Sequence, residues 1–182
     1  MADYASGDPA AFKRLFELLA PKLRAFFLRS FPDAVIADDL TQATFLKLHR
    51  ARASYRADRP LKPWLFTIAA GVRRDELRRR YRLPEQLDEA ALEQAEVGMG
   101  AAPPAAAPGA VSDHLDEVRA ALARLPESQR VVVHLHRYEE LTFEQIAEVL
   151  STTPGAVRVR ASRAYERLRQ ELRPVLARRR PR

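Results

Sequence analysis

The sequence contains no cysteine. This absence excludes disulfide bonds, thiolate zinc sites and cysteine nucleophiles, and nothing in the composition indicates an oxidising compartment. No segment approaches the roughly 18 uninterrupted apolar residues of a membrane span, and the N-terminus lacks a basic stretch followed by an apolar run. We therefore expect a soluble protein that is not exported and works in the cytoplasm.

Patterns typical of catalysis and of metal binding are also missing. The sequence has no glycine-rich phosphate loop and no nucleophile elbow. His49 and His114 have no carboxylate or cysteine partner at ligand spacing. His134 and His136 are two residues apart on an expected helix, so they point to different faces. We expect these histidines to be packing or surface residues, and we expect no enzyme activity, no metal site and no cofactor.

Positive charge is what the chain has in excess. The formal net charge is +7 and the estimated pI is about 10.2, in 182 residues of which 47% are hydrophobic. This length suits one ordinary domain or two small ones. The excess of basic over acidic residues favours a polyanionic partner, either nucleic acid or an anionic membrane surface. Charge alone does not decide between them.

Hydrophobic residues recur with the helical period in almost every patterned segment, and no run alternates like a half-buried strand. The sequence therefore predicts an all-α protein. A first helix is expected after Asp8-Pro9, with a break or bend at Pro21 and an end at Pro32. Its apolar stripe consists of Phe12, Leu15, Phe16, Leu19, Leu23, Phe26 and Phe27.

Two more helices complete a first block. One has the sequence DDLTQATFLKLHRAR, and the next begins near Pro63-Trp64. The apolar residues that the latter is expected to bury are Leu65, Ile68, Ala69 and Val72. The three helices predict a small bundle over residues 8–82.

A linker separates this block from a second one. Residues 83–112 include VGMGAAPPAAAPGAVS, a composition that cannot bury a core. Residues 113–175 return to the helical period, with a helix start at Leu125-Pro126-Glu127, and residues 176–182 form a basic tail. The sequence thus predicts two small helical domains on a flexible tether.

The second block contains a helix-turn-helix pattern. Thr142 is a suitable N-cap, and Gln145, three residues later, completes a capping box. After the short turn STT, the pair Thr153-Pro154 predicts a second N-cap followed by proline at the first helical position. A helix, a tight turn and a second helix are the expected result.

The second of these helices has a narrow inner face and a basic outer face. Val157, Ala161, Ala164, Leu168 and Leu172 follow the 3.6-residue period. The outer face carries Arg158, Val159, Ser162, Arg163 and Glu166, with Arg160 and Arg167 on its flanks. Forked or short polar groups that reach base edges, with arginines beside them for phosphates, are what a recognition helix needs. The alternative is a solvated basic helix of an ordinary bundle, but the caps, the turn and the inner face together favour DNA binding.

Three segments in order resemble the extracytoplasmic-function (group IV) sigma factors of bacterial RNA polymerase. They are DDLTQATFLKLHRA, LKPWLFTIAAGVRRDELRRR and LPESQRVVVHLHRYEELTFEQIAEVLSTTPGAVRVRASRAYERL, which are similar to regions 2.2, 2.3 to 2.4, and 4. The resemblance covers nearly the whole chain. It implies a polymerase subunit that directs promoter-specific initiation, with a region 2 bundle for core binding and the minus-ten element and a region 4 helix-turn-helix for the minus-thirty-five element.

The resemblance also implies partners. These are core RNA polymerase, through the clamp helices of its largest subunit and through its flap, promoter DNA, and an anti-sigma factor of the kind that is often membrane-anchored. Polymerase docking would fall to Asp38, Asp39 and Gln42, and this chain has Ala43 where the family usually has glutamate. The alternative for Asp38 and Asp39 is simple charge at a helix start, complementing the helix dipole.

For the minus-ten element the resemblance implies one face of the third helix and the loop before it. The residues are Tyr55, Arg56, Thr67, Ala70, Gly71, Arg74 and Arg78. Ala70-Gly71 stand where the family usually has arginine and asparagine, so the family's base preference does not carry over to this chain. The alternatives are that Gly71 is a tolerated weak helix residue and that the loop SYRADRP is a solvated connection. Trp64 is expected in the core.

Geometry implies that the two units separate on a promoter. Family promoters place the two elements roughly 25 base pairs apart, or about 85 Å. A linker of roughly 30 residues spans at most about 100 Å. The free protein is therefore expected to be more compact and unable to bind both elements.

Two other functions remain as alternatives. One is a stand-alone dimeric helix-turn-helix regulator, although no dimerisation helix is obvious and the first block would have no role. The other is an adaptor that binds only protein through its basic helices.

Overall fold

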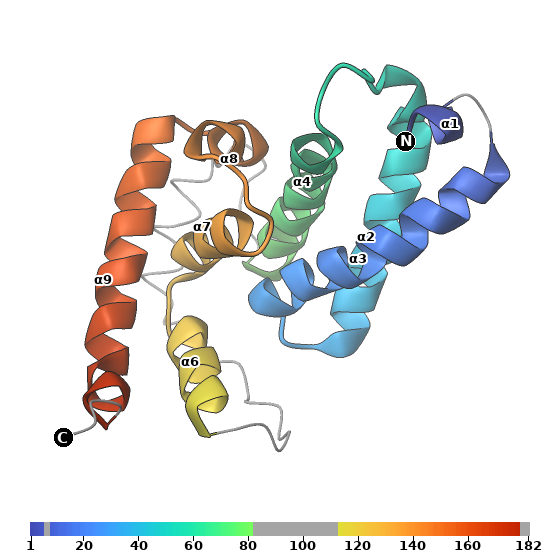
Figure 1. Cartoon of the computed structure of the whole chain (residues 1–182). Coiled ribbons are helices and arrows are strands. Elements are labelled where there is room, and N and C mark those ends of the chain that lie inside the picture. Colours follow the sequence, from blue (N-terminus) through green and yellow to red (C-terminus); the bar gives the residue numbers. More distant parts are fainter. Residues whose placement is uncertain (6–7, 82–112, 179–182) are drawn as a thin grey trace.

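The computed structural model describes residues 1–5, 8–81 and 113–178 (Figure 1). Every regular element in these ranges is a helix, as the periodicity predicts. The predicted linker over 83–112 and the end of the basic tail, residues 179–182, lie outside the described residues.

The N-terminal unit contains the three predicted helices and two short additions. Asp8 and Asp33 cap the first two long helices, because their carboxylates accept hydrogen bonds from the backbone N–H groups of Ala10 and Val35, each at 2.8 Å. The elements of the unit are α1 (Ala2–Ala5), α2 (Pro9–Ser30), α3 (Ala34–Ala51), the 3₁₀ turn η1 (Arg52–Ser54) and α4 (Leu61–Tyr81).

Of the predicted break or bend at Pro21, the break is wrong, since α2 runs continuously from Pro9 to Ser30. Proline inside a helix costs about 3 kcal/mol. However, Leu19 and Leu23 on either side of it are buried, and helices in proteins owe most of their stability to such packing. Phe16 also departs from the predicted apolar stripe, because its side chain is 43% exposed.

The C-terminal unit consists of α6 (Asp113–Ala123), α7 (Glu127–Arg137), α8 (Phe143–Leu150) and α9 (Pro154–Arg178). The predicted capping box at α8 is confirmed: Gln145 N–H donates to the Thr142 hydroxyl at 3.2 Å, and the Gln145 side chain accepts from Thr142 N–H at 3.0 Å. Thr153 caps α9 through the N–H of Ala156. Ser151 makes the turn between the two helices in the left-handed conformation, with φ 53°.

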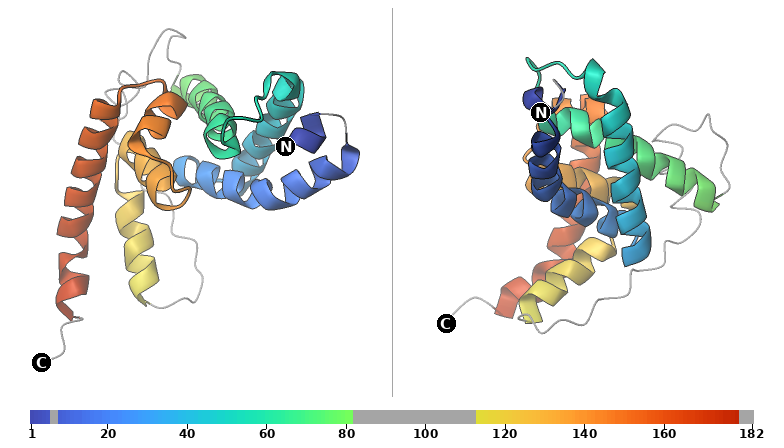
Figure 2. Two further views of the ribbon diagram at one scale, coloured as in Figure 1. Left: turned by 45° about the horizontal axis from the view of Figure 1, so that its top comes forward. Right: turned by 90° about the vertical axis from the view of Figure 1, so that its right-hand side faces the viewer.

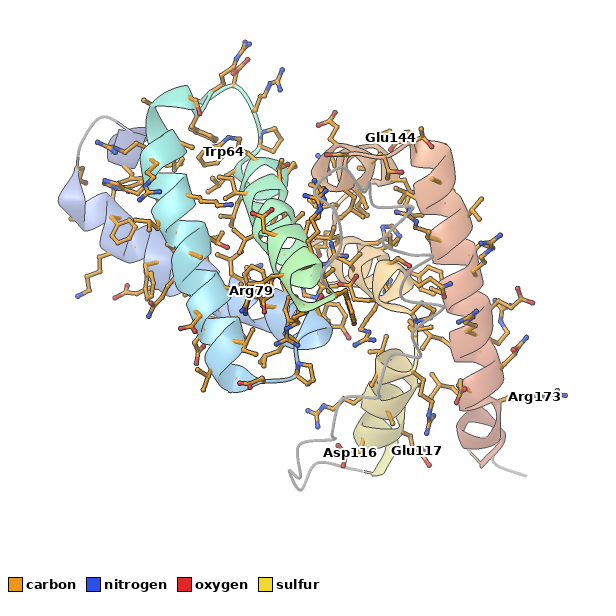
Figure 3. All side chains as sticks on the ribbon, turned by 180° about the vertical axis from the view of Figure 1, so that it is seen from behind. Trp64, Arg79, Asp116, Glu117, Glu144 and Arg173 are labelled. Atoms are coloured by element: carbon orange, nitrogen blue, oxygen red, sulfur yellow. The ribbon has the colours of Figure 1, made fainter. Side chains whose placement is uncertain are left out.

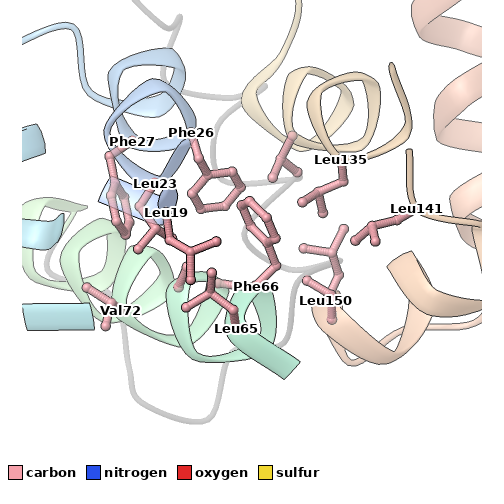
Figure 4. Close-up of a cluster of buried hydrophobic side chains, with 14 of the residues drawn as sticks. Leu19, Leu23, Phe26, Phe27, Leu65, Phe66, Val72, Leu135, Leu141 and Leu150 are labelled. Atoms are coloured by element: carbon pink, nitrogen blue, oxygen red, sulfur yellow. The ribbon is translucent and has the colours of Figure 1, made fainter. Parts of the chain in front are cut away.

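The two units lie against each other (Figure 2), and one continuous hydrophobic core joins them (Figure 4). α4 lies along α8, and α2 lies against α7. Phe26 and Phe66 of the N-terminal unit meet Leu135 and Leu150 of the C-terminal unit. The structure therefore has the compact arrangement expected for the free protein, and α9 lies on the side of the C-terminal unit away from α2 and α4 (Figure 1).

Candidate nucleic-acid interface and docking groove

The outer face of α9 is exposed as the sequence predicts. Arg158, Ser162, Arg163 and Arg167 are all exposed, and so is Val159 at 48%. On the opposite face Val157, Ala161 and Ala164 are buried, and their small size allows close packing on the helices beneath. The helix-turn-helix thus presents forked cationic groups and one methyl-bearing side chain to solvent near the N-terminal half of α9, which is the part that enters a major groove in this motif.

Arg160 is a correction to the predicted face. It was expected on the exposed flank, yet only 4% of it is exposed. Arg160 follows Val157 by three residues, and residues three apart lie on the same side of a helix. In this conformation its guanidinium is therefore part of the buried side of α9.

Glu144 stands beside the same exposed face, and the sequence reasoning missed it (Figure 3). Its Oε1 lies 2.5 Å from Nη2 of Arg158, and both side chains are more than half exposed. Hydrogen bonds from its own backbone N–H and from the Thr142 side chain hold the pKa of Glu144 below its usual value, and Arg158 adds to this. The available signal was its place in the first turn of α8, directly after the cap.

The predicted minus-ten face of α4 is only partly open. Thr67 is exposed and its hydroxyl donates to the carbonyl of Pro63 at 2.9 Å, whereas Arg74 and Arg78 are half-buried. Ala70 was expected on this face but is fully buried. The reason is that Ala70 follows Phe66 by one turn, on the side of α4 that packs against the C-terminal unit.

Gly71 lies where a side chain would meet nothing. A Cβ placed there has no heavy atom within 4 Å, apart from its own helix. Packing within the protein therefore does not require glycine at this position. Open space above the helix leaves room for a close approach from outside, which is consistent with the functional interpretation of Gly71.

The loop before α4 is held by its own contacts. The ring of Tyr55 lies 5.0 Å from that of Trp64, and its hydroxyl donates to the carbonyl of Arg59 at 2.9 Å. Arg56 forms a two-pronged pair with Asp58 in solvent. Trp64 is partly buried and packs against the core at the start of α4, as predicted (Figure 3).

A groove of about 510 Å³ lies between α2 and α3. We call it the docking groove; its lining residues are Phe12, Phe16, Asp39, Gln42, Ala43, Phe45, Leu46 and His49. It brings together two of the three residues predicted to bind polymerase, Asp39 and Gln42. Asp38 is not part of it and instead pairs with Arg24, with 2.7 Å between Nε and Oδ1.

Two exposed apolar side chains of the docking groove were not predicted from the sequence as part of a binding site. Phe16 is 43% exposed and Leu46 is 52% exposed. Ala43, in the position where glutamate was expected, contributes a methyl group to the lining. The groove is thus largely apolar with a carboxylate and an amide among its lining groups, a combination that suits a partner helix bearing both apolar and basic residues.

Helix α1 covers one side of this region. Tyr4 is buried, its ring lies 5.3 Å from that of Phe12, and its hydroxyl hydrogen-bonds Nδ1 of His49 at 2.5 Å. His49 is therefore a packing residue at the groove rather than a ligand.

The described ranges contain no cluster of three or more His, Cys, Asp or Glu side chains that could hold a metal ion. Among the helices of those ranges, none is both long and apolar enough to cross a membrane.

Two family models match the chain. One describes region 2 of sigma-70 and matches residues 15–83; the other describes region 4 of sigma-70 and matches residues 115–168. The first therefore covers α4 and every residue of the docking groove except Phe12, and the second covers the helix-turn-helix as far as Leu168 of α9.

Curated relatives and solved structures agree with these matches. The chain is 36% identical to the RNA polymerase sigma factor CarQ of Myxococcus xanthus, over 94% of this chain and 95% of CarQ. It is 33% identical to the sigma-H factor of Pseudomonas aeruginosa, over 93% and 90% of the two chains. The sigma factor RpoE of Bartonella quintana, solved with the anti-sigma factor NepR, has 28% identity and a TM-score of 0.70 over 90% of this chain and 97% of RpoE. CnrH, solved with the cytosolic domain of CnrY, has 27% identity and a TM-score of 0.63 over 95% and 94%.

Proposed function

Because the chain belongs to the extracytoplasmic-function group of the sigma-70 family of RNA polymerase sigma factors, we propose that its three exposed features divide promoter recognition among them. α9 binds the minus-thirty-five element, α4 and the loop before it bind the minus-ten element, and the docking groove binds core polymerase. The protein itself contributes contacts rather than catalysis. It works where RNA polymerase works, in the bacterial cytoplasm.

The exposed face of α9 carries this proposal furthest. Arg158 and Arg163 can each pair bidentately with a guanine, and Val159 can meet a thymine methyl group. Arg167, further along the helix, reaches the phosphates. Glu144 can accept a hydrogen bond from a cytosine amino group once Arg158 turns from it to the DNA.

The minus-ten element is recognised on α4. Arg74 and Arg78 supply positive charge for the backbone, Thr67 supplies an exposed hydroxyl, and the open space above Gly71 admits an extruded base. Tyr55 and Arg56 of the loop can stack on a base and contact a phosphate after leaving their present partners. Ala70 becomes available only when the C-terminal unit moves away from α4.

The docking groove receives the clamp helices of the polymerase. Phe16 and Leu46 supply apolar contact, while Asp39 and Gln42 supply a charge and a hydrogen-bonding amide. Asp38 acts from outside the groove, where Arg24 now holds it. Ala43 in place of the family's glutamate makes this contact more apolar than is usual.

An anti-sigma factor controls the protein in this proposal. Two solved structures to which it is similar over most of their length contain a second protein: the anti-sigma factor NepR with RpoE, and the cytosolic domain of CnrY with CnrH. A membrane-anchored regulator would connect the sigma factor to an external signal.

The test is transcription in vitro with a cognate core polymerase over a library of genomic promoter fragments. We expect the protein to direct initiation from a small set that shares two sequence elements about 25 base pairs apart, or about 85 Å. Binding to a symmetric operator as a stable dimer, with no promoter opened in the presence of core enzyme, would overturn the proposal.

A further inference from the structure

A buried ion pair joins the two units. Glu127, the first residue of α7, accepts two hydrogen bonds from the guanidinium of Arg73 on α4. The hydroxyl of Ser30, at the end of α2, donates to the same carboxylate at 2.5 Å. The side chains of Arg73 and Glu127 are only 1% and 7% exposed. A charge of each unit is thus kept out of water by the other unit.

The carboxyl of Glu127 stays ionised in this position. Burial alone would raise its pKa, but the charge and hydrogen bonds of Arg73, together with Ser30, bring it below its usual value. The pair is therefore a true ion pair with both partners charged at neutral pH.

Further polar contacts cross the same interface along the lengths of α2 and α7. The guanidinium of Arg130 on α7 donates to the carbonyl of Arg29 on α2 at 2.6 Å, and that of Arg29 lies 4.1 Å from the ring centre of Tyr138. At the other end, Nζ of Lys22 lies 3.4 Å from a carboxylate oxygen of Glu139, and Lys62 donates to the Glu139 carbonyl at 3.1 Å.

An interface of this composition stabilises the closed arrangement of the two units and still allows them to separate. Removing one partner of a buried ion pair strands the other charge in the protein interior, which is strongly unfavourable. Moving the two units apart does not strand either charge, because both return to water together. The apolar side chains of Phe26 and Phe66 differ from the charged pair, because opening exposes them to water and leaves an apolar surface that is unfavourable unless another protein covers it. Opening is thus favoured when a partner takes over that surface.

The closed arrangement competes with promoter binding. It covers the side of α4 that holds Phe66, Ala70 and Arg73, directly beside Arg74 of the minus-ten face in the sequence. It also keeps the units in contact, whereas the two promoter elements lie about 85 Å apart.

We propose that the Arg73–Glu127 pair is an intramolecular lock that holds the free protein closed and that a partner must release before both promoter elements can be bound. The existence of the closed state does not depend on the proposed function. Only the statement that closure prevents promoter binding rests on the proposed function. The partner that releases the lock is one that covers the apolar surface around Phe26 and Phe66.

The lock can be tested by a distance measurement in the free protein. Because the chain has no cysteine, Lys13→Cys and Gln170→Cys place spin labels at two exposed sites, one on each unit. We expect one narrow distance distribution for this labelled parent. In the Glu127→Gln variant the ratio of closed to open molecules should fall at least about tenfold, because the Arg73 charge loses its partner. Asp75→Asn, which removes an exposed ion pair to Lys47 within the N-terminal unit, is the matched control and should leave the distribution unchanged.

A double variant separates the lock from a local effect on α7. Arg73→Met combined with Glu127→Gln removes the stranded charge, so the closed distribution should be largely recovered. Lys62→Ala, at the edge of the interface, should open the protein to a smaller extent. Circular dichroism confirms that each variant keeps its helices. A broad distribution in the parent, an unchanged distribution in a folded Glu127→Gln variant, or no recovery in the double variant would each overturn the proposal. Transcription from a promoter is a separate readout, so failure of the proposed function would not be mistaken for failure of the lock.

Discussion

The imidazole of His134 on α7 lies 5.4 Å from the ring of Phe26 on α2, which buries a titratable side chain of one unit against the other. His134 is 2% exposed and also stacks on Tyr138 at 5.5 Å. Burial, with the positive charges of Arg29 and Lys22, lowers its pKa to about 3. The Glu139 carboxylate, 3.8 Å from Nε2, acts in the opposite direction but is outweighed, and Lys62 binds the backbone of the same residue.

We expect the closed state to weaken in acid because of His134. When the units separate, the imidazole returns to water and to a pKa near 6.5, so the open state binds a proton that the closed state does not. The stability of the closed state is therefore complete above pH 6.5. Below that pH it falls by about 1.4 kcal/mol for each pH unit until the pH approaches the closed-state value of about 3. The measurement is the spin-label distance distribution between pH 7.5 and 5.

Variants at two histidines show whether His134 is responsible. His134→Gln cannot gain the proton and should flatten the pH dependence over this range. His136→Gln changes a partly exposed histidine that stacks on Phe143 within the C-terminal unit, and it should keep the parent's dependence. The same slope in the His134→Gln variant as in the parent would contradict the assignment.

Charge reversal on the outer face of α9 should strongly reduce promoter use without affecting polymerase binding. Arg163→Glu replaces an exposed cation of the recognition face by an anion, so promoter-dependent transcription should fall at least about tenfold. Affinity for core polymerase should stay near the parent value. Arg169→Glu makes the same charge change almost two turns further along α9, beyond the N-terminal half that enters a major groove, and should have a much smaller effect. Loss of core binding in Arg163→Glu would mean that the faces of α9 are wrongly assigned.

Substitutions in the docking groove should weaken core binding selectively. Asp39→Ala, Gln42→Ala and Leu46→Ala each remove one lining group, and we expect each to raise the Kd for core polymerase by about tenfold. Leu18→Ala is the matched control, because Leu18 is 68% exposed on α2 but does not line the groove. Titration of labelled core enzyme measures the affinity, and thermal unfolding checks that the C-terminal unit is intact. Parent-like affinity in all three groove variants would remove this docking site.

The features that could be predicted from the sequence are those that depend on neighbours along the chain. The caps Thr142 and Thr153 satisfy backbone groups within three residues, so their sequence pattern determines their geometry. The inner face of α9 follows the helical period, and Val157 and Ala161 are buried as that period requires. Phe16 shows the limit of the same reasoning. The apolar stripe of α2 is wider than the surface that the core covers, so Phe16 at its edge stays exposed.

Contacts between the units could not be predicted in this way. Arg73 and Glu127 are 54 residues apart, and no local pattern indicates that an arginine within a basic run will be fully buried by another part of the chain. The exposure of Ala70 was wrongly predicted for the same reason, since its cover comes from the C-terminal unit. The docking groove likewise depends on how α2 and α3 cross. Long-range packing thus decides which residues of an amphipathic helix are available for function.

The capping box of α8 offers a test of how the helix-turn-helix is stabilised. Thr142→Ala removes the acceptor for the Gln145 N–H, and loss of such a cap costs about 1 kcal/mol. We expect the free energy of unfolding to fall by that amount and binding to duplex minus-thirty-five DNA to weaken only slightly at low temperature, because α9 and its outer face are unchanged. Thr142→Ser keeps the hydroxyl and should behave like the parent in urea denaturation. Equal destabilisation by alanine and serine would show that the cap's hydrogen bond is not what stabilises the start of α8.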